Sequence, residues 1–215
     1  MQSRLERWAP LTGIGFVVLW IVGFFLAVTD SPDFAARPAE NLEYYVDNKG
    51  SIIGGVIASS LALVLLVWFL GCIRAAMVRA EGGDARVAAT GFAGGIIGVG
   101  LEMAAMAIFI MPALRLDERD KLSLESATTF TDLGNITYGF AAPLGFGVLF
   151  FAIAVLGFRH GAVPKWWAVI TAVLGIVMIV PFVSWSVGFV LPIWVIVMTI
   201  LLLRSERAPV ASAAA

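Results

Sequence analysis

The chain has 215 residues, of which 60% are hydrophobic and only 13% are charged, and its mean hydropathy is +0.96. Because soluble domains carry roughly 25% charged residues, this composition excludes a water-soluble globular protein and indicates an integral membrane protein. No run of Lys and Arg favours binding to nucleic acid. The single cysteine, Cys72, excludes an intramolecular disulfide and a four-cysteine metal site.

Six apolar stretches lie along the chain, each near or above the ~20 residues that a helix needs to cross a bilayer. They cover residues 8–28, 51–73, 87–114, 130–158, 167–183 and 186–203. The first follows two arginines as a signal peptide would, but its apolar core exceeds the roughly 7 to 15 residues of a signal, so we expect an uncleaved helix. The sequence predicts an all-α, polytopic transmembrane bundle of six helices in three hairpins, forming a single domain over residues 1–215.

Basic residues in the loops predict the orientation, because cytoplasmic loops carry an excess of Lys and Arg. With the N-terminus inside, nine lie on the cytoplasmic side and five outside. The inner set is Arg4, Arg7, Arg74, Arg79, Arg86, Arg159, Lys165, Arg204 and Arg207, and the outer set is Arg37, Lys49, Arg115, Arg119 and Lys121. We therefore expect a multi-pass protein of the plasma (inner) membrane with both termini in the cytoplasm.

Glycines and prolines predict how the helices pack, since membrane helices approach closely at small residues. The third apolar stretch carries two overlapping small-xxx-small ridges, Gly91 with Gly95 and Gly94 with Gly98, which makes it the expected central helix. The same ridges could face a second subunit, so a homo-oligomer or a membrane protein partner stays open. Pro143, at mid-span of the fourth stretch, predicts a bend.

Two loops are expected on the outer side. In the first, Pro38 can open a short helix and Gly50 can close it, while Leu42, Tyr45 and Val46 share one face. This helix should lie on the outer surface of the bundle. The second loop, residues 117–125, alternates acids and bases and is expected to be a solvated polar connector.

Glu102 is the one charged residue well inside a predicted span. An ionisable group at that depth is costly unless it is neutral, paired or facing water, so it marks a candidate functional site. Counting the same number of residues inward from the outer ends of the third and fourth helices places Glu102 level with about Ala142, and Tyr138 lies within a turn of that level.

Asp132, Asn135 and Tyr138 recur every three residues and form a polar stripe on the fourth helix. If the stripe faces the third helix, it would supply Glu102 with hydrogen-bond partners leading to the outer surface. Three interpretations remain open for Glu102: a structural carboxylic acid, a proton or cation site, and a polar anchor for a ligand.

Several kinds of chemistry lack the residues that they need. His160 is the only histidine, so one chain cannot build a bis-histidine haem or a multi-histidine zinc site. No lysine lies within a span, and no Walker A, HExxH or GxSxG pattern occurs. We therefore expect no metal, no cofactor and no catalytic residues, and the sequence favours a protein that is not an enzyme.

The run Trp8-Ala-Pro-Leu-Thr-Gly-Ile-Gly-Phe, the Ser31-Pro-Asp-Phe loop and the later Glu43-Tyr-Tyr resemble small actinobacterial membrane proteins of the domain-of-unknown-function type. The resemblance implies a bundle of six spans over most of the chain. It implies no catalytic residues.

These features favour a protein that binds or transports a small apolar or amphiphilic molecule. The predicted site is a polar pocket in the outer half of the bundle around Glu102, lined by some of Asn135, Tyr138 and Asp132 and covered by residues 42–46. A non-catalytic accessory subunit of a larger membrane complex is the alternative, and an intramembrane enzyme is a distant third.

Overall fold

The computed structural model describes residues 8–28, 31–32, 36–119, 122–180 and 187–207, and within these ranges it contains helices and no strand. A 3₁₀ turn at Ala9–Leu11 leads into the first long helix, and a π-helical turn at Thr137–Ala141 joins α6 to α7. The helices are α2 (Thr12–Val28), α3 (Pro38–Asp47), α4 (Lys49–Glu81), α5 (Arg86–Arg119), α6 (Leu124–Ile136), α7 (Ala142–His160), α8 (Lys165–Ile179) and α9 (Val187–Arg207). The predicted all-α class is confirmed.

Five of the described helices are long and apolar enough to cross a membrane. They are Ala9–Ala27, Lys49–Glu81, Arg86–Leu116, the continuous helix Leu124–His160, and Gly188–Ser205. The remaining apolar helix, α8, has 15 residues and is therefore only about 22 Å long, short of the ~30 Å of a bilayer core. Its predicted continuation to residue 183 falls partly outside the described residues. The chain is thus a membrane-embedded helical bundle, while the count of six stays a prediction.

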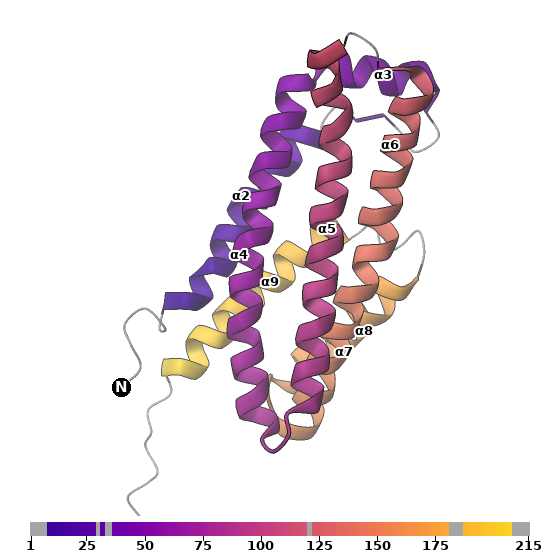
Figure 1. Ribbon diagram of the computed structural model, residues 1–215. Coiled ribbons are helices and arrows are strands. Elements are labelled where there is room, and N and C mark those ends of the chain that lie inside the picture. The colour runs from indigo at the N-terminus through magenta and orange to yellow at the C-terminus, as the bar shows by residue number, and fades with distance from the viewer. Residues whose placement is uncertain (1–7, 29–30, 33–35, 120–121, 181–186, 208–215) are drawn as a thin grey trace, which may run out of the picture.

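The long helices α4, α5 and α6–α7 run side by side and give the bundle two distinct ends (Figure 1). One end carries α3, and we call it the α3 end. The other carries the turns at residues 82–85 and 161–164, and we call it the turn end. Gly82 and Gly161 stop α4 and α7 with φ angles of 65° and 67°, which glycine adopts without steric cost. The pair α8–α9 reaches only part of the way from the turn end toward α3 (Figure 1).

Helix α3 forms where it was expected, but its C-terminal end and its buried face differ from the prediction. Pro38 begins the helix, and the Glu40 carboxylate accepts the backbone N–H of Arg37 at 3.2 Å. Gly50 does not close α3, because the chain turns at Asn48 and α4 begins at Lys49. Of the residues expected to share one face, Tyr45 is buried but Val46 is 53% exposed. The buried face instead contains Asn41, one turn before Tyr45.

The glycine ridges of α5 are used inside the bundle. A methyl group built on Gly145 of α7 would lie 2.7 Å from the carbonyl oxygen of Gly94 and 2.8 Å from the Cα of Gly98. The backbones of α5 and α7 therefore touch at this point, and any side chain there would push them apart. The α2–α4 pair is built in the same way, since Gly55 lies directly against the backbone at Gly23.

The third span, expected to be the central helix, is less enclosed than the fourth. In the apolar part of Leu124–His160, 67% of the residues are buried, against 39% for α5. Each helix packs mainly on two neighbours, since α5 lies against α4 and α7 while α7 lies against α5 and α8, but α5 leaves one face open.

Pro143 does not break this helix. The N–H of Ala142 donates to the carbonyl of Thr137, five residues back, so the chain widens into a π-helical turn just before the proline. The wider turn moves the side chains of residues 137–141 off the regular helical positions. Such turns are frequent at functional sites.

Candidate functional site

Glu102 lies on the inward face of α5 and is 1% exposed. Its neighbours one turn away on this face, Gly98 and Ala105, are buried too. Neither carboxyl oxygen has a hydrogen-bond partner among the described residues. The hydrogen bonds expected from the fourth helix are therefore not formed, and the carboxyl group is enclosed without a donor.

The depth predicted for Glu102 is supported by the contact between α5 and α7. Gly98 touches Gly145, and the two helices run in opposite directions, so one turn along each brings Glu102 level with Ala141. Ala141 is the last residue of the π-helical turn. The widened turn thus lies beside the buried acid, one residue from the predicted Ala142.

Tyr138 lies in the same π-helical turn, about one turn closer to the α3 end than Ala141. It is three residues from Ala141, so it lies within about a turn of the level of Glu102. The Tyr138 hydroxyl points at the backbone of Gly188 in α9, since a methyl group built on Gly188 would collide with it. Tyr138 therefore connects the π-helical turn with α9 near the level of the acid.

Trp20 of α2 completes this layer. Its ring stacks on Tyr138 with centroids 6.3 Å apart and an interplanar angle of 11°. Its indole N–H donates to the carbonyl of Gly188 at 3.0 Å. The layer of Trp20, Tyr138 and Gly188 lies on the α3 side of Glu102, where a molecule approaching from that end would meet it first.

The rest of the predicted stripe is less closely connected with the acid. Asn135 is half-buried on α6, and Asp132 is exposed. Of the three stripe residues, Tyr138 lies nearest to the level of Glu102 along the helix. The drift of a three-residue repeat around a helix accounts for this, because it turns Asp132 away from the side that Tyr138 occupies.

The predicted cover from α3 also lies beyond the immediate surroundings of Glu102. The Tyr45 hydroxyl is 3.2 Å from that of Thr131 on α6, seven residues before Tyr138. Helix α3 therefore closes the α3 end of the bundle at about two turns from Tyr138. Asn41, buried beside it, has an unpartnered side-chain oxygen. A role for residues 42–46 in covering a ligand stays a prediction.

The site is suited to hydrogen bonding rather than to metal chemistry. Among the described residues, no group of three or more His, Cys, Asp and Glu side chains could hold a metal ion. What the site offers is one carboxyl group, a phenol, an indole and the carbonyls of a π-helical turn, all within apolar surroundings.

Trp20 and Gly188 were not predicted as members of the site. A tryptophan deep in a span by itself indicates only core or lipid-facing volume. Its contact with Gly188 joins residues 168 positions apart in the chain, and no local pattern indicates such a contact.

Comparison with protein families, with curated proteins and with solved structures finds no match to this chain.

Proposed function

We propose that this membrane protein binds a small apolar or amphiphilic molecule in the interior of its bundle, with the Glu102 carboxyl group as the polar anchor. The observation that carries the proposal is the enclosure of Glu102 with both oxygens unpartnered. A carboxyl group enclosed in apolar surroundings loses its hydrogen bonds to water at a cost of roughly 2–7 kcal/mol even when it is neutral, and packing alone does not readily offset this cost. A ligand that supplies the missing partner removes this cost.

The chemistry of the site sets the class of ligand. A neutral carboxylic acid has one O–H donor and remaining acceptor capacity, so it can bind a carbonyl, hydroxyl or amide group. The side chains around it are apolar or aromatic, which suits an apolar body with one polar group. An enzymatic role has no support, because no nucleophile or base accompanies the acid among the described residues.

The orientation and the sixth crossing form part of the proposal. We count α8 as a short crossing at which the bilayer thins, which returns the C-terminus to the side of the N-terminus. The excess of basic residues then places the turn end in the cytoplasm and the α3 end outside. In this arrangement Glu102 lies in the outer half of the bundle, and Asn135 and Asp132 lead from it toward the outer surface.

The test is to recover the molecule that the protein carries. The protein is purified in a mild detergent, its bound small molecules are extracted into organic solvent, and the extract is analysed by mass spectrometry. We expect one species near stoichiometric amount in the wild type, lowered at least tenfold in Glu102→Leu, which removes both the donor and the acceptor of this side chain. Glu125→Leu, on the exposed start of α6, is the matched control and should retain the species.

The same extraction can contradict the proposal. Equal recovery from the wild type and from both variants would show that Glu102 holds nothing. Recovery of no species from the wild type at all would contradict it as well. Size-exclusion profiles and circular dichroism of the three proteins establish that they are equally folded.

An accessory role is the second candidate, and the open face of α5 favours it. Ala93, Gly100, Ala104 and Ala107 are exposed there, and such small residues permit another helix to approach closely. A cysteine at Ala104, in a chain with Cys72→Ser, should form a disulfide-linked dimer or a cross-link to a partner. A cysteine at Val64, exposed on α4, is the control. Equal cross-linking at both positions would remove the support for an interface on α5.

A further inference from the structure

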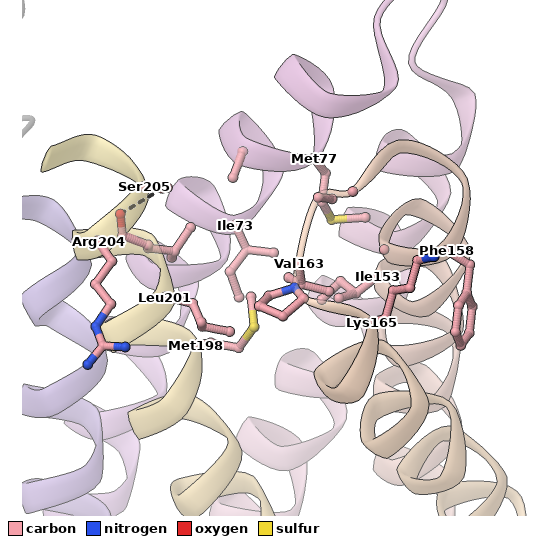
Figure 2. Close-up of a pocket in the computed structure, with 16 residues that line it drawn as sticks. Ile73, Met77, Ile153, Phe158, Val163, Lys165, Met198, Leu201, Arg204 and Ser205 are labelled. Atoms are coloured by element: carbon pink, nitrogen blue, oxygen red, sulfur yellow. Dashed lines mark hydrogen bonds between the residues drawn. The ribbon is translucent and has the colours of Figure 1, made fainter. Parts of the chain in front are cut away.

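A second feature with ligand-binding character lies far from Glu102, at the turn end. It is a cavity of about 680 Å³ between α4, α7 and α9, closed at its base by the turn that leads into α8. Its volume falls within the roughly 300 to 1,000 Å³ typical of sites for small ligands. Figure 2 shows Ile73, Met198 and Val163 in its centre, with Arg204 on one side and Lys165 on the other.

The floor of the cavity is apolar and belongs to the bundle core. Ile73 and Ile153 are each 1% exposed, and Met77 and Met198 are each 3% exposed. Phe158 is the exception among these lining residues, because its side chain is half exposed and one side of the cavity is open there. An apolar hollow of this kind does not hold water well, because water needs two to four polar partners. It suits a hydrocarbon chain.

The rim of the cavity is cationic. Lys165 is the first residue of α8, Arg204 lies in the last turns of α9, and both side chains are exposed. No Asp or Glu is among the lining residues. Within the described part of the chain, neither cation has an ion-pair partner, since the one salt bridge there joins Arg37 and Glu40.

Glu81, the acid at the end of α4, does not neutralise this rim. Glu81, at the end of α4, directs its two carboxylate oxygens to the backbone N–H groups of Val87 (2.9 Å) and Ala88 (2.7 Å). That carboxylate therefore caps the first turn of α5, and neither it nor any residue that lines the cavity places a negative charge at the mouth.

We propose that this cavity binds an anionic phospholipid, with one acyl chain on the floor formed by Ile73, Ile153 and Met198 and the acidic headgroup at the cationic rim that carries Lys165 and Arg204. The site is at the level where spanning helices end, which is the depth of lipid headgroups. Basic pockets between transmembrane helices bind acidic headgroups in this way. Each buried methylene of the chain adds about 0.8 kcal/mol, and the two cations add selectivity for an acidic headgroup. The proposal is independent of a ligand at Glu102.

The experiment compares two lipids that differ in charge alone. The full chain is titrated in a mild detergent with dioleoyl-phosphatidylglycerol or with dioleoyl-phosphatidylcholine, and native mass spectrometry counts the bound lipids. Each basic residue at the surface contributes about a fivefold preference, so we expect the wild type to bind the anionic lipid about thirtyfold more tightly. Lys165→Gln with Arg204→Gln should bring the two affinities within about a factor of two.

Two further variants separate the parts of the site. Arg79→Gln with Arg159→Gln removes two exposed charges from the same end but none from the lining, and it should retain the selectivity. Ala76→Phe places an aromatic ring in the cavity and should weaken both lipids at least tenfold. All of these positions are exposed or half-buried, which favours folded variants.

Equal affinity of the wild type for the two lipids overturns the proposal, and this comparison needs no variant. Selectivity for the anionic lipid that survives in the Lys165 and Arg204 double variant also overturns it. An equal loss of that selectivity in the Arg79 and Arg159 control does so too. A dimer that excludes lipid from the titration would assign the cavity to a second copy of the chain and would overturn it too.

Discussion

The contact between Gly145 and the α5 backbone gives a quantitative prediction. In Gly145→Ala, the new methyl group would lie 2.7 Å from the Gly94 carbonyl oxygen and 2.8 Å from the Gly98 Cα, whereas ordinary contacts are 3.4–4 Å. These atoms belong to a helix backbone and cannot rotate away, so α5 and α7 must separate. Overpacking of this kind costs typically 1–3 kcal/mol, and backbone contacts place it near 3 kcal/mol. The gain in helix propensity from Gly to Ala, about 1 kcal/mol, leaves a net loss of about 2 kcal/mol.

Gly100→Ala is the matched control, because it makes the same change in the same pair of helices. A methyl group at Gly100 meets nothing within 4 Å, so the variant keeps the propensity gain without a clash. The two variants should differ by about 3 kcal/mol in the free energy of unfolding, measured by reversible unfolding in mixed detergent and SDS micelles. A difference below about 0.5 kcal/mol would refute the close packing of α5 on α7 through Gly145.

Three further predictions concern other parts of the chain. Burial raises the pKa of Tyr45 in α3, so the folded protein keeps this proton at a pH where the unfolded chain loses it. The stability of α3 docking should be intact below about pH 10 and should decline as the pH rises from there toward the folded pKa. Proteolysis of α3 should become faster over that range in the wild type but not in Tyr45→Phe. The infrared spectrum at neutral pH should contain the C=O band of a protonated acid that disappears in Glu102→Gln, and identical spectra would show that Glu102 is ionised. Reporter enzymes fused after Gly82 and after Asp120 should report the cytoplasm and the outer side respectively, and an outer-side signal from the first fusion would contradict the proposed orientation.

The five long apolar helices could be predicted from the sequence because length and hydropathy decide where a helix can cross a bilayer. The close contact of Gly94 and Gly98 with α7 followed from glycine spacing, which reflects a requirement of membrane helix packing. The depth expected for Glu102 relative to α7 followed from helix rise alone, and the contact of Gly98 with Gly145 agrees with it. Each of these rests on a regular repeat along one or two helices.

Features that depend on side-chain packing between distant helices could not be predicted in this way. The stacking of Trp20 on Tyr138 and the bond to Gly188 join three helices. The π-helical turn depends on how the chain accommodates Pro143, for which a bend was the simpler expectation. The cavity at the turn end is formed by four separate segments, and none of them is unusual by itself. The end of α3 was misplaced because Gly50 can close a helix but is equally tolerated in the first turn of α4.

The central claim is that Glu102 holds a molecule inside the bundle, and a density map of the wild-type protein purified in mild detergent tests it most directly. The account predicts density that the chain does not explain, with a polar atom within about 3 Å of a Glu102 carboxyl oxygen and beside the π-helical turn at Thr137–Ala141. Apolar side chains closed around Glu102, with no density for a ligand or a water at its oxygens, would contradict it.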